Sequence, residues 1–442
     1  MSNNQNKMPK GIPYIVGNEA AERFSFYGMK AILTVFMTEH LVNSSGELAV
    51  MSNTEAQFWY HTFVTAVYFL PLAGALLTDL FWGKYRTIII LSVVYCLGHL
   101  ALAMDETRIG LLLGLTMISI GSGGIKPAVS AHVGDQFNKS NGHLLEKVFG
   151  YFYFSINFGS FFSFMITPLL LQNYGPQIAF GVPGGLMILA TIIFWVGRKE
   201  YTSVPANGQE FLKELKSPLM RGVLLKMLVM NLFLAFFWSL YDQNGSSWVN
   251  QARSPLMSKE ISFLGWKFEL LPSQVGAINP ILVMVFIPLF TYVVYPFFTK
   301  RLKVTQMGKV SVGFFIACVS FFLMTWVQYQ LDAGISMSIG WQLLAFTIIT
   351  IAEVMIYQTC LELSYTQAPK TMKSLVMSFL MLSIAFGNII TTGVNYFILK
   401  EDGTSKLEGG EYFLFFSCLM LVSALLFIPY AKHYKEEVIL QE

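Results

Sequence analysis

Long apolar segments, separated by short polar or Pro/Gly-containing turns, follow one another along almost the whole chain. Most are about 20 residues or longer, the length that an α-helix needs to cross a hydrocarbon layer about 30 Å thick. We predict membrane-crossing helices at residues 13–40, 55–81, 87–104, 108–133, 146–171, 176–197, 221–250, 273–299, 305–329, 338–365, 369–399 and 411–434. The pattern of these twelve segments predicts an all-α polytopic membrane protein.

Lysine and arginine are distributed unevenly among the connections between these helices. They are more frequent in alternate connections, among them 198–221 and 300–309, and connections rich in positive charge stay in the cytoplasm. The polar start of the chain runs into the first apolar segment without a small-residue cleavage site, so we expect no removable signal peptide. The prediction is a multi-pass protein of the cytoplasmic or plasma membrane with both termini in the cytoplasm.

Composition narrows the classes of function. Of the 442 residues, 54% are hydrophobic and only 12% are charged, about half the charged share of a soluble domain. The net charge of +3 is too small to indicate nucleic-acid binding, and the four cysteines lie inside apolar segments, where they suit packing. Metal-binding, phosphate-binding and nucleophile motifs are absent. We expect no enzyme and no bound metal or cofactor, and a gradient would have to drive any active transport.

One extended polar connection, residues 199–220, divides the predicted helices into six and six. We expect an N-terminal six-helix bundle at residues 1–198 and a C-terminal bundle at residues 221–442, with the connection in the cytoplasm. Transporters often consist of two such halves, with the solute site between them near the middle of the membrane. Channels and membrane enzymes can also have twelve helices, so this organisation alone does not define the function.

Charged residues within apolar helices are costly and usually face a cavity or a partner. On the first helix, spacing places four of them on one face, with Tyr27 at its border: Glu19, Glu22, Arg23 and Lys30. A neutral cluster that only fixes packing is the alternative to a functional stripe. Lys126 lies in the segment GSGGIKPAVSAH of the fourth helix, where its ammonium either reaches the cytoplasmic surface or faces a cavity opened by its small neighbours.

The deep charges of the C-terminal half are mainly acidic. Asp242 ends the segment FFWSLYD on the seventh helix, and Glu353 lies in the middle of the tenth. A cavity between the halves would therefore have one basic and one acidic wall. Such walls suit a zwitterion, which has a carboxylate at one end and an ammonium at the other, and without a ligand they could form salt bridges.

His61 and the polar turn after the second helix are two further candidates. A membrane histidine often makes only packing hydrogen bonds, but imidazole titrates near neutral pH and also suits a proton carrier. Asp79, Gly83, Lys84 and Arg86 lie in the turn GALLTDLFWGKYRT between the second and third helices and place an acid and bases there. That turn is either a solvated loop or, as we favour, a hinge that latches neighbouring helix ends when the cytoplasmic side closes.

Several ordered motifs resemble those of a known family. The turn GALLTDLFWGKYRT is similar to the loop between helices two and three of the major facilitator superfamily, and EAAERFSFYG resembles a motif of its proton-dependent oligopeptide transporters, the POT family. Other similar blocks are GSGGIKPAVSAHVGDQF, FYFSINFGS, FWSLYDQNGSSW and LELSYTQAPKTMKSLVMS. The resemblance implies the major facilitator fold, with twelve helices in two six-helix bundles, and proton-coupled import of di- and tripeptides by alternating access.

The resemblance also implies roles for individual residues. Proton coupling would use Glu19, Glu22, Arg23, His61 and Asp242. Substrate binding would use Tyr27, Lys30, Tyr68, Lys126, Asn157, Asn279 and Glu353. Within that set the lysines would face the peptide carboxylate, and Glu353 and the asparagines would face its amino end and backbone. Gating would use Asp79 and Arg86 and the pairs Lys30 with Asp242 and Lys126 with Glu353.

Three positions depart from the family pattern. Asp242 is one methylene shorter than the glutamate of many bacterial members, although animal members also have aspartate there. Phe26 stands where the family has a tyrosine, which removes a hydroxyl from the edge of the pocket. Lys30 stands where arginine is common, so a planar two-pronged grip on a carboxylate becomes a point charge.

Three alternatives stay open at this point. The protein could be a relative of the family that carries nitrate, an amino acid or another small anion. It could also be a nutrient sensor that binds peptide without moving it. The third alternative, a passive channel, is disfavoured by the opposed buried charges. The partners that we expect are di- and tripeptides, protons and the lipid bilayer, with the protein acting as a monomer.

Overall fold

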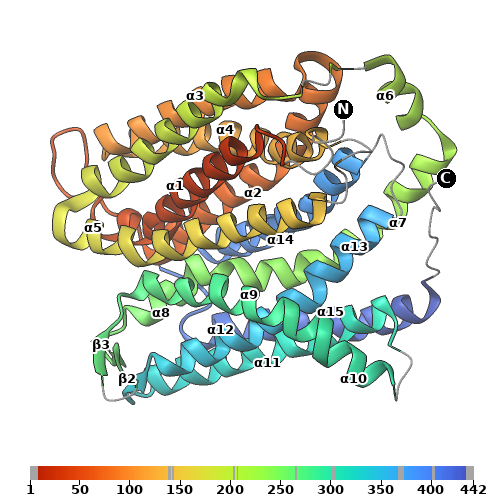
Figure 1. The fold of residues 1–442 in the computed structure, drawn as a ribbon. Coiled ribbons are helices and arrows are strands. Elements are labelled where there is room, and N and C mark those ends of the chain that lie inside the picture. Colours follow the sequence, from red (N-terminus) through yellow and green to blue (C-terminus); the bar gives the residue numbers. More distant parts are fainter. Residues whose placement is uncertain are drawn as a thin grey trace.

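A computed structural model describes residues 8–137, 141, 144–202, 205–206, 208–263, 266–300, 304–366, 373–400 and 404–434. Parts of three sequence features lie outside the described residues: 203–204 and 207 of the polar connection, 301–303 of a basic connection, and 367–372 of the motif LELSYTQAPKTMKSLVMS. The described chain is almost wholly helical, and the long helices run roughly parallel to one another (Figure 1).

The first half of the chain forms five long helices and one short π-helical segment that extends the second of them. Their bounds are α1 Ile12–Glu39, α2 Asn53–Leu77, η1 Thr78–Trp82, α3 Lys84–Met104, α4 Arg108–Asp135 and α5 Leu145–Val196. Helix α5 is broken at Gly175, whose φ of 80° is unfavourable for other residues, and Pro176 follows it. The break divides α5 into the two crossings that the sequence predicted at 146–171 and 176–197.

The second half contains longer helices interrupted by short segments. Its elements are α7 Pro218–Tyr241, η4 Asp242–Gly245, α8 Ser247–Ala252, η5 Pro272–Ala277, α9 Ile278–Leu289, η6 Phe290–Val294, α10 Tyr295–Thr299, α11 Gln306–Asp332, α12 Gly340–Glu353, η7 Val354–Gln358, α13 Thr359–Thr366, α14 Lys373–Ile398 and α15 Gly410–His433. The crossing predicted at 273–299 is therefore η5, α9, η6 and α10 in succession, and the one at 338–365 is α12, η7 and α13.

The crossings number twelve within the described residues. Ten segments are long and apolar enough to span a membrane, and one of them, Lys147–Lys199, contains the break at Gly175 and supplies two crossings. Helix α1 has the length of a crossing but carries the charged stripe, and it packs along α5. The broken segment thus counts twice among the ten, which gives eleven crossings, and helix α1 is the twelfth.

Two separate hydrophobic clusters form the core. One consists of buried residues between Ile12 and Phe194, and the other of buried residues between Phe211 and Phe427. Tyr68 of α2 packs against both clusters. The halves therefore have their own cores and meet along α2 and α14, and where α5 contacts η5 and α9.

Small β-elements mark one end of the bundles, which we call the hairpin end. Strands β2 (Glu260–Phe263) and β3 (Trp266–Glu269) form an antiparallel hairpin, and β1 (Met257–Ser258) pairs in parallel with β4 (Met337–Ser338). The short helix α6 (Gly208–Leu215), within the polar connection, lies at the opposite end, which we call the linker end (Figure 1).

A contact between two glycines sets the position of Lys126. A Cβ atom on Gly74 of α2 would collide with the backbone of Gly124 in α4, so only glycine permits the observed approach of the two helices. Lys126 lies two residues beyond Gly124 and is buried. The small-residue segment thus brings the lysine close to Tyr68 of α2.

Candidate solute and proton site

The charged stripe of α1 forms a compact ion cluster. Arg23 Nε lies 2.8 Å from Oε1 of Glu19 and 2.7 Å from Oε2 of Glu22, and all three side chains are buried. Two acids share one arginine, so the three groups carry one net negative charge when all are ionised. A proton taken up by either acid would make the cluster neutral.

Lys30, two turns along the same helix, pairs with the other half of the chain. Its Nζ lies 3.0 Å from Oδ1 of Asp242, and both residues are buried. Asn388 of α14 donates from its side-chain nitrogen to Oδ2 of Asp242, at 2.7 Å. Both carboxylate oxygens are thereby satisfied, as a buried charge requires, and the pair of Lys30 with Asp242 that the sequence predicted is present.

His61 joins the same network from α2. One ring nitrogen, Nδ1, lies 2.6 Å from Oδ1 of Asn388, and the other, Nε2, lies 2.9 Å from Oγ of Ser246. The side chain of Asn388 therefore links the histidine of the N-terminal half to Asp242 of the C-terminal half. The route from imidazole to carboxylate passes through one amide group.

Lys126 has no hydrogen-bond partner for its Nζ among the described residues. The nitrogen lies 4.4 Å from the ring centre of Phe26 and 4.2 Å from that of Tyr68, so two aromatic faces provide its contacts. A buried ammonium without an acceptor is unstable relative to a paired one. The arrangement leaves the lysine ready to receive an anionic group.

Glu353 stands on the opposite half and is partly exposed. Asn279 of α9 donates to its Oε2 at 2.8 Å and also lies 3.1 Å from Oγ1 of Thr350. The sequence predicted that Asn279 and Glu353 serve the same part of the site, and the structure brings them into contact. The donors that engage the carboxylate are neutral, and it has no basic partner among the described residues.

The expected pair of Lys126 with Glu353 is not formed, and this expectation is corrected for the observed conformation. Lys126 is held between Phe26 and Tyr68, while Glu353 is engaged by Asn279. Each charge has found a local contact on its own half, so the two walls face each other without a bridge.

The remaining predicted binding residues lie around these charges. Tyr27 and Tyr68 are partly exposed, and the ring of Tyr27 packs edge-on against Phe26 with centres 5.3 Å apart. Asn157 is buried, and its amide donates to the backbone oxygen of Tyr153 one turn earlier, at 2.9 Å. Its amide oxygen is therefore the group that can still act as an acceptor.

At the turn after α2, where a latch was predicted, Lys84 forms the contact, whereas Asp79 and Arg86 do not. Lys84, at the start of α3, donates to both carboxylate oxygens of Asp135 at the end of α4, at 2.7 and 2.6 Å. Within the described residues neither Asp79 nor Arg86 forms an ion pair, and Arg86 is exposed. The turn does tie helix ends together, but through Lys84.

Further contacts between the halves were not predicted from the sequence. Thr34 donates to the backbone oxygen of Gly245 at 2.6 Å, and Arg253 donates to Oγ1 of Thr38 at 2.7 Å. Arg253 also pairs with Glu39 at the end of α1. The spacing of Lys30, Thr34 and Thr38, one turn apart on α1, was a signal for a row of such contacts. Their partners lie more than 200 residues away, however, and no local pattern identifies them.

The fold and the site together define a polytopic membrane transporter of the major facilitator type, with charged groups buried where two six-helix bundles meet. A sequence model of the POT family matches residues 85–221 and 213–409. The chain belongs to the POT family, and the predicted family and fold class are confirmed.

Solved structures and curated relatives agree with this assignment. The chain is similar to an auto-inhibited POT family peptide transporter, with 32% identity, 98% and 99% of the two chains covered and a TM-score of 0.84. It is similar to the POT family transporter PepTSo, with 34% identity, 96% and 98% covered and a TM-score of 0.85. Rat solute carrier family 15 member 2 is 34% identical over 74% of this chain and 50% of its own length. The chain thus spans about half the length of the curated relatives that it matches.

Proposed function

We propose that this protein imports di- and tripeptides together with protons by alternating access. Similarity to peptide transporters supports the class of substrate. The observation that carries the proposal is the pair of unbridged charges on facing halves: among the described residues, Lys126 has no acceptor and Glu353 has only neutral partners. A basic group and an acidic group on opposite walls complement the carboxylate and the ammonium of a peptide.

The substrate would bind between these walls. Lys126, assisted by Lys30 once it leaves Asp242, receives the peptide carboxylate. Glu353 receives the ammonium. The backbone of the peptide and its side chains meet polar and aromatic groups of both halves, namely Asn157, Asn279, Tyr27 and Tyr68.

Proton coupling would use two buried groups of residues. In the first, protonation of Glu19 or Glu22 loosens the hold of Arg23 and neutralises the cluster on α1. In the second, a proton on Asp242 removes the charge that holds Lys30. His61, tied to the same carboxylate by Asn388, is the nearby titratable group that delivers or receives that proton once the amide moves aside. Release of Lys30 both opens the contact between the halves and frees an ammonium for substrate.

The halves 1–198 and 221–442 would move as two bundles, joined by the connection 199–220. We assign the hairpin end to the outside and the linker end, with both termini, to the cytoplasm, in line with the lysine and arginine distribution. The protein would act as a monomer in the cytoplasmic or plasma membrane. The proton gradient would supply the energy without a cofactor.

Purified protein in liposomes with an imposed inward proton gradient tests the proposal. We expect accumulation of a labelled dipeptide, competition by unlabelled di- and tripeptides but not by nitrate, and acidification of the lumen during uptake. Lys126→Ala and Glu353→Ala should each abolish driven uptake. Lys406→Ala, which removes an exposed lysine whose ammonium donates only to a backbone oxygen, is the matched control. Peptide binding without accumulation or counterflow would contradict transport, and competition by nitrate alone would contradict peptide as the substrate.

A further inference from the structure

A row of contacts on one face of α1 holds the hairpin end closed. Lys30, Thr34 and Thr38 lie at successive fourth positions, and each bonds to the C-terminal half. Their partners, in the same order, are Asp242, Gly245 and Arg253. The last contact is the outermost of the three, and 24% of the Arg253 side chain is accessible.

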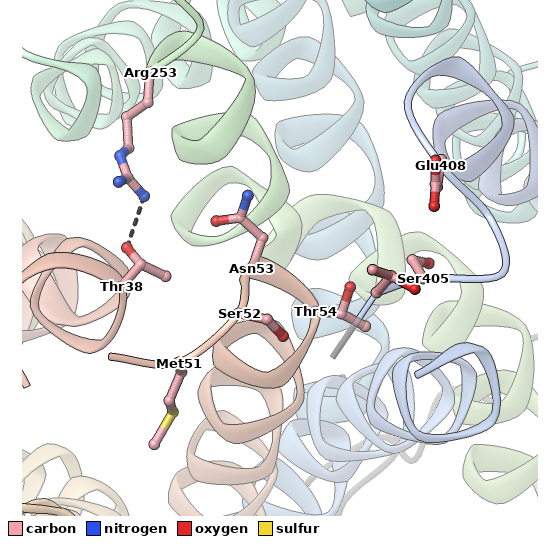
Figure 2. A pocket seen from close by; sticks show the side chains of 9 residues that line it. Thr38, Met51, Ser52, Asn53, Thr54, Arg253, Ser405 and Glu408 are labelled. Atoms are coloured by element: carbon pink, nitrogen blue, oxygen red, sulfur yellow. Dashed lines mark hydrogen bonds between the residues drawn. The ribbon is translucent and has the colours of Figure 1, made fainter. Parts of the chain in front are cut away.

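Arg253 also borders a polar cavity of about 470 Å³ at this end. One wall comes from the N-terminal half, Thr38 and residues 51–54, and the other from Arg253, Thr404, Ser405 and Glu408 of the C-terminal half. Arg253 and Glu408 lie on opposite sides of the cavity, with Asn53 between them (Figure 2). The cavity is separate from the central site, because none of the proposed central binding residues lines it.

The charges of the cavity match a small zwitterion. A guanidinium binds a carboxylate through two parallel hydrogen bonds, so a peptide carboxylate is a natural ligand for Arg253. Glu408 is exposed and can meet the ammonium, and hydroxyl and amide groups between them can meet the peptide bond. The volume lies in the range of small-molecule sites.

The present partner of Arg253 is replaceable. The Glu39 side chain is 44% accessible, and ion pairs between exposed groups contribute little to stability. A carboxylate that enters the cavity and takes the guanidinium would remove Arg253 from Glu39 and Thr38 together. The outermost contact between the halves would then be lost as a direct result of binding.

We propose that this cavity is an outer recognition site for the free carboxylate of a peptide, and that binding there releases the Arg253 contact and favours opening of the hairpin end. The proposal rests on the proposed function for the identity of the ligand. It differs from that function in its site, since Lys126 and Glu353 play no part in the outer step.

Distance measurements between spin labels test the outer site separately from transport. Labels are placed at Ser44→Cys and Ser336→Cys, which are exposed at the hairpin end on opposite halves, in protein lacking the two cysteines that are not buried, Cys96 and Cys418. The Lys126→Ala change is added to disable the central site. We expect a free dipeptide to shift the distribution towards longer distances, and the same dipeptide with a carboxamide end to have no effect.

Three variants, each in the labelled Lys126→Ala protein, complete the test. Asn53→Trp fills the cavity from an exposed position and should abolish the response. Glu408→Gln should raise the dipeptide concentration that gives the half-maximal distance change by about tenfold, as expected when a hydrogen bond to a charged group is lost. Arg108→Ala breaks an ion pair with Glu55 at the same end, but within one half, and should leave the response intact. A dipeptide response that requires Lys126, or an equal response to the carboxamide, would overturn the outer site while leaving peptide transport standing. Failure of driven uptake with a preserved distance response would instead contradict the proposed function alone.

Discussion

Lys30 and Asp242, 212 positions apart in the chain, form a buried ion pair that joins the two halves, with Nζ 3.0 Å from Oδ1. Asn388 completes the coordination of the carboxylate. Removal of one charge leaves the other buried and unpaired, which costs about 3–5 kcal/mol in comparable sites. We therefore propose that this pair couples the ionisation of Asp242 to the closed state of the hairpin end.

Asp242→Asn should open the hairpin end. The neutral amide of asparagine cannot balance the positive charge of Lys30, so the closed state loses its main electrostatic contact. We expect longer distances between labels at Ser44 and Ser336 without peptide, and loss of proton-driven uptake with counterflow retained. In the double variant Lys30→Ala with Asp242→Asn, the label distance should increase by less than the sum of the increases in the two single variants. An increase equal to that sum would show that the pair does not couple the halves.

Replacing Lys126 should stabilise the substrate-free protein while abolishing transport. Its ammonium has no hydrogen-bond acceptor among the described residues, so Lys126→Met removes a buried charge and keeps a similar volume. We expect the free energy of unfolding to rise by about 1–4 kcal/mol, seen as a higher melting temperature in detergent. Dipeptide should raise the melting temperature of the wild type more than that of Lys126→Met, which keeps only the proposed outer site. A less stable Lys126→Met protein would mean that the aromatic faces already compensate the charge.

Glu353→Gln should weaken binding of peptides with a free amino end. Glutamine can still accept a hydrogen bond from Asn279 but lacks the charge that attracts an ammonium. We expect the KM of a dipeptide to rise about tenfold or more, because hydrogen bonds to charged groups contribute about 1.5–3 kcal/mol. The KM of the N-acetylated dipeptide should change little. An equal increase for both peptides would assign Glu353 to another part of the substrate.

His61→Gln separates a proton carrier from a packing residue. Glutamine can bond to Asn388 and Ser246 as the imidazole does, but it does not titrate. We expect proton-driven accumulation to be lost and exchange of labelled for unlabelled peptide to persist. Retained accumulation in His61→Gln, together with its loss in His61→Ala, would make the histidine a structural tie between the halves.

The turn after α2 offers a comparison between two basic residues. Lys84→Ala should slow uptake, since it breaks the contact between the ends of α3 and α4, whereas Arg86→Ala should have little effect. The Lys84–Asp135 pair is partly exposed, so we expect a change of about fivefold or less, equivalent to at most about 1 kcal/mol. A larger effect of Arg86→Ala would restore the latch that the sequence predicted.

The sequence predicted the helices because length and hydropathy are local properties. The first crossing was expected at 13–40 and is Ile12–Glu39, and the last was expected at 411–434 and is Gly410–His433. The hairpin of β2 and β3 was missed within a connection read as a loop. Its strands have four residues each, too short for a clear alternating pattern.

The buried charges were also found from the sequence, because each stands out in an apolar segment. The ion pair of Lys30 with Asp242 was predicted and is present. The predicted pair of Lys126 with Glu353 is not formed, because Lys126 contacts Phe26 and Tyr68. Pairing depends on the relative position of the halves, which local sequence does not encode. Asn388 was overlooked, although an asparagine within the apolar segment SIAFGNIITT was a usable signal.

The π-helical segment η7 begins directly after Glu353. A π-helical turn amounts to one extra residue inserted into an α-helix. Deletion of a single residue from Val354–Gln358 would therefore convert this turn into a regular α-helical turn and leave the helix beyond it close to its present orientation. An alignment of relatives that places a one-residue gap here would record the loss of the π-helical turn beside the carboxylate, while the rest of the tenth crossing keeps its orientation.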